Sequence, residues 1–246
     1  MLKIKFCLVV ICSLWVCNAF AQDQLKESKY LFFIEPELML GQTVANYNDF
    51  PDTKPVKSFF LSVGIKDTRN IHSSKYYNHP TTGVNLSYSN LGNDSILGKS
   101  FGVMPFIQFY PWGNRQKRWS LKFGVGGSYF TKSYRQSNQN LAIGSHLTWS
   151  FQAFLYRELF ALNRMQFRMG AGYLHSSNGH TQLPNMGLNS AQVSLSCQWT
   201  SRPLISKKKD IYLGANMGLN RRYFINVRSG IGVHEYGGKS KPVGRW

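Results

Sequence analysis

Charge is scarce in this sequence, and negative charge is scarcest. Charged residues make up 16% of the 246 residues, against roughly 25% in ordinary soluble proteins. Only 11 residues are acidic, whereas 29 are Lys or Arg, and the formal net charge is +18. A soluble helical bundle is disfavoured because its helices need charged solvent faces. Disorder is excluded because aromatic residues reach 15% of the chain.

Long hydrophobic runs are also missing beyond the N-terminus. After residue 22 no apolar stretch approaches the roughly 18 residues that a membrane helix requires. The exception is the N-terminal segment, where Lys3 and Lys5 precede an apolar core and residues 19–21, Ala-Phe-Ala, form a small-x-small cleavage site. We therefore predict that residues 1–21 are a cleaved secretory signal peptide. An uncleaved N-terminal membrane anchor is the alternative interpretation.

Cysteine is nearly absent from the chain that would remain after cleavage. Three of the four cysteines lie within residues 1–21, which leaves Cys197 alone. No intramolecular disulfide can then staple residues 22–246, so their fold must be held by other means. Cleavage also removes two lysines and no acidic residue, so the formal net charge becomes +16. No linker or repeat interrupts residues 22–246, and we expect them to form a single barrel domain.

A period of two residues runs through most of the remaining sequence. Between Ala191 and Trp199, for example, every second residue is apolar and each residue between them is Ser or Gln. This alternation is typical of β-strands with one apolar and one polar face. Ten segments show the pattern or a shorter version of it: 30–41, 59–65, 83–88, 103–109, 119–129, 147–155, 167–177, 189–200, 211–219 and 223–233.

Two all-β architectures fit this alternation. A soluble sandwich buries its apolar faces, whereas a transmembrane barrel turns them toward lipid and lines its lumen with the polar faces. The signal peptide, the run lengths of about 9–13 residues and the aromatic residues near several run ends, such as Trp149 and Trp199, favour the barrel. We predict an antiparallel up-and-down transmembrane β-barrel of about 8–10 strands in the bacterial outer membrane. Eight strands with an extra N-terminal hairpin are equally consistent.

One hairpin carries polar residues where the alternation calls for apolar ones. Counted by parity from Phe167, the side chains of His175 and Ser177 lie on the lipid face, and Asn189 begins the lipid face of the next strand. Polar groups facing lipid are costly unless paired, so we expect this cluster to be paired and functional. An imidazole activates a serine nucleophile, and a third group orients the imidazole. The alternative interpretation is that His175 and Ser177 only mark the strand end at headgroup level.

The same hairpin carries a family resemblance. It rests on a set of small and polar residues: His175, Ser176, Ser177, Asn178, Gly179, Pro184, Asn185, Gly187 and Asn189. With the upstream segments 123–134 and 140–147, this set resembles the lipid A 3-O-deacylase family of outer-membrane acyl ester hydrolases. The resemblance covers roughly residues 58–234.

The resemblance implies a lipid-facing active site on an eight-stranded barrel. Such a site removes an ester-linked fatty acyl chain from lipid A of lipopolysaccharide and needs no metal or cofactor. The resemblance implies that His175 is the general base and that Ser177 is the nucleophile. It associates Asn178 and Asn185 with an oxyanion hole, where preorganised donors stabilise the developing negative charge.

Two further positions complete the implied site. The resemblance associates Gly187 with substrate binding, and well-known members carry Glu where this chain has Asn189. An Asn can accept the imidazole hydrogen bond but supplies no negative charge. One of Glu35, Glu37 and Glu158, which we otherwise expect to pair with arginines, is an alternative orienter. A non-enzymatic structural or lipid-binding barrel that has lost its acid is the main alternative function, and a small porin is a third.

The remaining candidates have structural interpretations. We expect His146 to form hydrogen bonds on the polar face, His180 to be solvated in a loop, and Cys197 to act as a small apolar residue on the lipid face. No His, Cys and carboxylate cluster has the spacing of a zinc site. We interpret the positive charge as attraction to lipopolysaccharide phosphates and outer-membrane lipids, because an exported barrel does not meet nucleic acid. The oligomeric state is not indicated.

Overall fold

The computed structural model describes residues 30–69, 79–111, 119–135 and 139–203, together with the backbone of two short C-terminal strands. Among these residues no helix is long and apolar enough to cross a membrane. The predicted signal peptide and the predicted strands 211–219 and 223–233 lie outside the described residues. The strands are β1 (Tyr30–Val44), β2 (Val56–Asp67), β3 (Thr81–Asn90), β4 (Lys99–Phe109), β5 (Trp119–Phe130), β6 (Leu147–Leu162), β7 (Met165–Ser177), β8 (Leu188–Thr200), β9 (Glu235–Gly238) and β10 (Lys241–Arg245).

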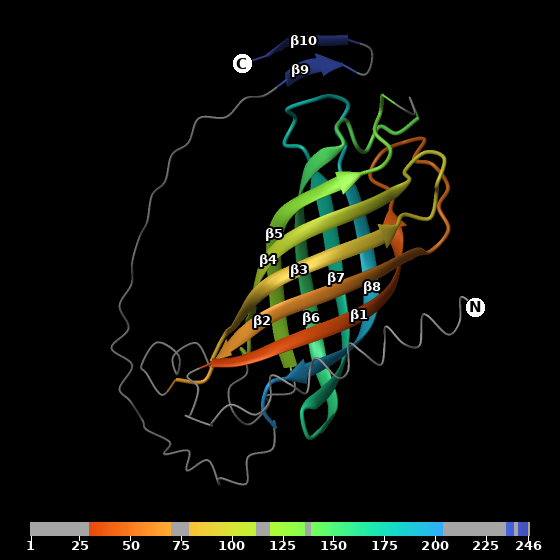
Figure 1. Ribbon diagram of the computed structural model, residues 1–246. Helices are drawn as coiled ribbons and strands as arrows, with labels where there is room; N and C mark the ends of the chain where they lie inside the picture. The colour runs from red at the N-terminus through yellow and green to blue at the C-terminus, as the bar shows by residue number, and fades with distance from the viewer. Residues whose placement is uncertain are drawn as a thin grey trace, which may run out of the picture.

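Strands β1 to β8 form one closed antiparallel barrel (Figure 1). Each strand pairs with its neighbours in sequence, and β1 closes the barrel by pairing with both β2 and β8. Closure leaves no free strand edge, so the backbone groups of the wall are satisfied by one another. The first eight predicted segments each fall within one of these strands, which confirms the up-and-down barrel. The segment 30–41 is β1 itself, so it belongs to the wall and not to an extra hairpin.

The alternation of the sequence becomes an inner and an outer face. Along β8, Ser190 and Gln192 are buried, whereas Val193 is 60% exposed. Trp149 on β6 is 68% exposed on the same outer surface. The apolar side chains thus form the outside of the barrel and the polar side chains line its inside, as a membrane wall requires.

Buried charged groups fill the half of the lumen that is remote from the β7–β8 loop. Arg168 forms an ion pair with Glu35, and its Nε donates to the same carboxylate at 2.9 Å. Ser196 Oγ also donates to Glu35, at 2.5 Å. Glu37 accepts a hydrogen bond from the phenol of Tyr156 at 3.1 Å. The predicted pairing with an arginine is therefore confirmed for Glu35, while Glu37 has a tyrosine partner.

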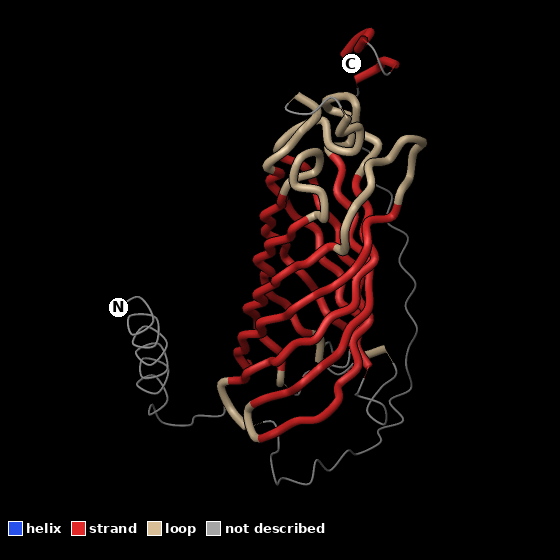
Figure 2. The backbone as a smooth tube through the Cα atoms, turned by 90° about the vertical axis from the view of Figure 1, so that its right-hand side faces the viewer, coloured by secondary structure: helices blue, strands red, loops and turns tan. Residues whose placement is uncertain are grey.

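An apolar cluster lies beside these charged groups inside the barrel, because Phe60 is paired in register with Glu37. Phe60, Met104 and Phe154 belong to a buried cluster inside the wall. At the end of the barrel where the β1–β2, β3–β4, β5–β6 and β7–β8 loops gather (Figure 2), a second buried cluster is built from loops and strand ends. Its members are Leu91, Leu97, Phe130, Ala142, Ile143 and Leu188. The loop end is therefore packed, and the β7–β8 loop rests on a fixed base.

Candidate active site

The His175 side chain is held by Asn189 on the outer wall. The antiparallel register of β7 and β8 places these residues directly opposite each other, at the rim where residues 178–187 connect the two strands. His175 Nδ1 and Asn189 Oδ1 are 2.7 Å apart. Because an amide oxygen can only accept, Nδ1 carries the proton and donates it. The lone pair of Nε2 is therefore available to take a proton from another group.

Ser177 lies on the same outward face, two residues beyond His175. Two residues of strand span about 6.6 Å, and no hydrogen bond joins the two side chains in the described structure. Instead, Ser177 Oγ accepts a hydrogen bond from Asn185 Nδ2 at 2.7 Å and another from the Gly179 backbone N–H at 3.3 Å. The serine oxygen therefore lies at the focus of two N–H donors.

Asn178 and Asn185 are brought together but occupy different places. The backbone N–H of Asn178 donates to Asn185 Oδ1 at 3.1 Å, which turns the amide nitrogen of Asn185 toward Ser177. The Asn178 side chain donates to Ser145 Oγ at 3.2 Å and to the Gln182 carbonyl at 2.7 Å. The Asn178 amide is thus engaged within the loop, whereas the Asn185 amide contacts the serine.

Gly187 allows the loop to approach the imidazole closely. Its φ of +78° favours glycine, and a Cβ at this position would lie 3.0 Å from His175 Cε1. The segment before β8 is anchored on two sides. Gly187 N–H donates to the Ala142 carbonyl at 3.0 Å, and Asn46 Nδ2 donates to the Met186 carbonyl at 2.6 Å. These bonds fix the loop that carries Asn185 against the strand that carries His175.

Gly179 and Asn46 also shape the site, although the motif indicated no role for Gly179 and the sequence did not single out Asn46. The Asn-Gly pair directly after Ser177 was a usable signal, because glycine with positive φ, here +65°, can turn a backbone N–H back toward the strand. Asn46 gave no local signal, since it lies in the β1–β2 loop and reaches Met186 only because β1 closes the barrel beside β8.

Aromatic side chains of β6 flank the site on the outer wall. Trp149 lies opposite Ser177 and Phe151 lies opposite His175 in the β6–β7 register. Ser177 and His175 are half-buried, while Trp149 and Phe151 project from the wall. A substrate could therefore reach the serine sideways along an apolar surface.

The other titratable candidates lie apart from His175. Glu35 and Glu37 are buried in the lumen network, and Glu158 accepts a hydrogen bond from Gln166 near the opposite end of the barrel. His146 Nδ1 is 2.6 Å from the Phe130 carbonyl oxygen. Asn189, and none of these acidic residues, is accordingly the hydrogen-bond partner of His175 Nδ1. No cluster of His, Cys and carboxylate residues that could hold a metal occurs in the described part of the chain.

Comparison with known families decides the membership of the chain. A sequence model of the family described as lipid A 3-O-deacylase (PagL) matches residues 62–198, which is more than half of the chain and includes every candidate site residue from His175 to Asn189. The chain belongs to this family. The PagL family consists of lipid A deacylases, so the resemblance found in the hairpin is confirmed at the level of the family.

Solved structures give similarities of fold. The crystal structure of the outer membrane enzyme PagL is 18% identical, with a TM-score of 0.46 over 66% of this chain and 97% of that one. The crystal structure of Neisserial surface protein A is 10% identical, with a TM-score of 0.35 over 70% and 97%. The solid-state NMR structure of the outer membrane protein AlkL in lipid bilayers is 8% identical, with a TM-score of 0.39 over 75% and 96%. A comparison with curated proteins gives no match.

Proposed function

We propose that this chain is a serine ester hydrolase of the outer membrane that releases an ester-linked acyl chain from lipid A. The observation that carries the proposal is the outward-facing rim arrangement, in which Asn189 fixes the His175 tautomer and Asn185 holds Ser177 Oγ. The acyl esters of lipid A lie between a sugar headgroup and hydrocarbon chains. A serine at the rim of an apolar wall is at the matching depth.

The first half-reaction forms an acyl-enzyme. His175 Nε2 takes the proton of Ser177 as its oxygen attacks the ester carbonyl carbon. Catalytic hydrogen bonds commonly tighten only when substrate is bound, so His175 and Ser177 would close on each other in the complex. The negative charge on the former carbonyl oxygen accepts hydrogen bonds from Asn185 Nδ2 and the Gly179 N–H. When this tetrahedral intermediate collapses, the bond between the carbonyl carbon and the sugar oxygen breaks. The sugar oxygen leaves as a hydroxyl group with the proton from His175.

The second half-reaction restores the enzyme. Water attacks the acyl carbon after giving a proton to His175 Nε2, and the same donors stabilise the second oxyanion. Ser177 leaves with the proton from His175, and the fatty acid is released. Asn189 orients the imidazole throughout but stabilises its charged form less than a carboxylate would.

Two adjacent serines supply the test. Ser177→Ala should abolish acyl release, whereas Ser176→Ala should not, because Ser176 faces the lumen and bonds to Ser150 at 2.6 Å. The readout is the mass spectrum of lipid A incubated with each purified, refolded variant. Unchanged lipid A with the wild-type chain, or equal deacylation by Ser177→Ala, would refute the proposal.

A non-enzymatic lipid-binding barrel is the second candidate, and the neutral Asn189 favours it. This candidate predicts identical lipid A masses for the wild type and for both serine variants. Either function requires export, and we propose that residues 1–21 act as a cleaved signal peptide and that residues 22–246 form one domain. N-terminal sequencing of the protein recovered from outer membranes tests the cleavage after residue 21.

A further inference from the structure

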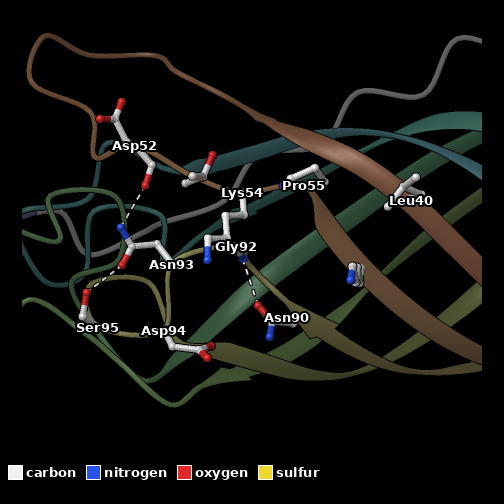
Figure 3. Close-up of a pocket in the computed structure, with 11 residues that line it drawn as sticks. Leu40, Asp52, Lys54, Pro55, Asn90, Gly92, Asn93, Asp94 and Ser95 are labelled. Atoms are coloured by element: carbon white, nitrogen blue, oxygen red, sulfur yellow. Dashed lines mark hydrogen bonds between the residues drawn. The ribbon is translucent and has the colours of Figure 1, made fainter.

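A second feature of the loop end is a hollow of about 980 Å³ (Figure 3). The β1–β2 and β3–β4 loops form its sides, and outward-facing residues of β1 and β2 form its floor. It therefore joins the lipid-facing wall to the water-facing rim. The site described above does not use any of its residues.

The walls of the hollow are tied together by hydrogen bonds. The backbone N–H of Lys54 donates to the Gly92 carbonyl at 3.0 Å, and Asn93 Nδ2 donates to the Asp52 carbonyl at 2.9 Å. Gly92 has a φ of +82°, and a Cβ there would lie 2.0 Å from the Lys54 carbonyl oxygen. The two loops are thus packed at backbone distance, and the hollow is preformed for a ligand.

The floor of the hollow places a cation on an apolar wall. Lys57 is an exposed outward residue, paired in register with Leu40 on one side and Asn90 on the other. A charged side chain at the edge of the hydrocarbon region needs a counter-charge or water. Lys54 is exposed on the loop above it. The two ammonium groups line one hollow and suit a phosphate, which both can contact as point charges.

The remaining lining suits a sugar. Asn90 Oδ1 accepts the Gly92 N–H at 3.0 Å, which leaves the amide NH2 of Asn90 as a donor for a ligand. Asp52 and Asp94 also line the hollow, and their carboxylates can accept hydrogen bonds from hydroxyl groups. The two carboxylates would repel a phosphate ion that has no sugar attached. A phosphorylated sugar instead donates hydrogen bonds from its hydroxyl groups to the carboxylates, and its phosphate is attracted to the lysines.

We propose that this hollow binds the phosphate-bearing sugar headgroup of the lipid A molecule whose acyl ester lies at Ser177. The inference rests on the proposed function and adds a headgroup subsite to it. Ser177 lies on β7, and β2 is three strands farther around the wall through β8 and β1, a separation of about 14 Å along the wall. A phosphorylated disaccharide can bridge this distance while Leu40 contacts one of its acyl chains.

The test measures binding without catalysis. In a Ser177→Ala background, the double variant Lys54→Gln/Lys57→Gln should bind phosphorylated lipid A in detergent micelles about tenfold more weakly than the Ser177→Ala parent. Lys66→Gln is the matched control, because Lys66 lies on the same strand but near its opposite end, with its Nζ 4.7 Å from the Tyr110 ring centroid. The control should leave the affinity unchanged.

Two further ligands identify the source of the phosphate. Lipid A treated to remove its phosphates should bind the parent and the double variant equally. Inorganic phosphate should fail to displace phosphorylated lipid A, and its full displacement by inorganic phosphate would assign the hollow to the free anion. An affinity that changes less than about twofold in the double variant, or falls equally in Lys66→Gln, would overturn the proposal. Acyl release by the wild type is measured separately, so failure of the hydrolase proposal is distinguishable.

Discussion

Ser176 and Ser177 are neighbours on β7, yet they belong to different environments. Ser176 is buried in the lumen and bonds to the hydroxyl of Ser150. Ser177 lies on the outer wall and accepts from the amide of Asn185 and the N–H of Gly179. In the lumen, polar groups satisfy one another and stabilise the barrel. On the wall, they are held by donors that a reacting substrate could share.

Among variants of the outer wall and the lumen, His175→Ala is expected to reduce deacylation the most. Because His175 Nε2 is the proposed proton acceptor, the variant should lose deacylation by at least about a thousandfold. Its unfolding free energy should change by no more than about 1 kcal/mol, since only one half-buried hydrogen bond is lost. Acyl release and urea unfolding in lipid vesicles measure the two quantities. Appreciable activity would remove His175 from the proposed mechanism.

A substitution in the lumen is expected to lower the stability of the barrel and to leave deacylation nearly unchanged. Arg168→Ala leaves the Glu35 carboxylate buried without its ion pair, which should destabilise the barrel by about 3–5 kcal/mol. Deacylation by the folded fraction should stay within about twofold of the wild type. Arg157→Ala is the control, because Arg157 stacks over the Trp119 ring on the outer surface. The Arg157→Ala variant should lower the free energy of unfolding by about 1 kcal/mol. Equal destabilisation by Arg168→Ala and Arg157→Ala would contradict the claim that buried lumen groups stabilise the barrel more than groups on the outer wall do.

Asn185→Ala tests the donor that the wall supplies to the oxyanion. Loss of one such donor should lower kcat about 100- to 1000-fold with little change in KM. A steady-state comparison on purified lipid A separates the two constants. A rise in KM with unchanged kcat would mean that Asn185 binds the ground state of the substrate.

The smallest effect is expected from Asn189→Glu. A carboxylate would keep the hydrogen bond to His175 Nδ1 and stabilise the imidazolium, so kcat should stay the same or rise by up to about tenfold. The variant is assayed beside the wild type on the same lipid A. A Glu variant without activity would show that position 189 has a different role in this chain.

Much of the architecture was predictable because it follows a short-range rule. Alternation with a period of two assigns each side chain to one face, and the first eight of the ten segments found in this way each lie within one wall strand. The same parity placed His175, Ser177 and Asn189 on the outer face, and the hairpin register placed His175 opposite Asn189. Local pattern was therefore sufficient to assign the side chains of the strands to the inner or the outer face.

Contacts between distant loops could not be predicted in this way. Asn46 reaches Met186 across 140 residues, and the two loops that form the hollow are joined by a backbone hydrogen bond between Lys54 and Gly92, which belong to different hairpins. The path of the β7–β8 loop also decides which of the two side-chain amides, that of Asn178 or that of Asn185, turns toward Ser177. The sequence does not indicate this path. These features arise from tertiary packing of polar loops, which has no periodic signature.

The most direct test of the central claim is covalent trapping of the nucleophile. A serine-directed phosphonate carrying a fatty acyl-like chain should phosphonylate Ser177 through its Oγ, and peptide mass spectrometry should place the adduct on residue 177. The adduct should form in Ser176→Ala and be absent in His175→Ala, because activation of the hydroxyl requires the imidazole. An adduct on another residue, or an unmodified folded wild-type chain, would contradict the account.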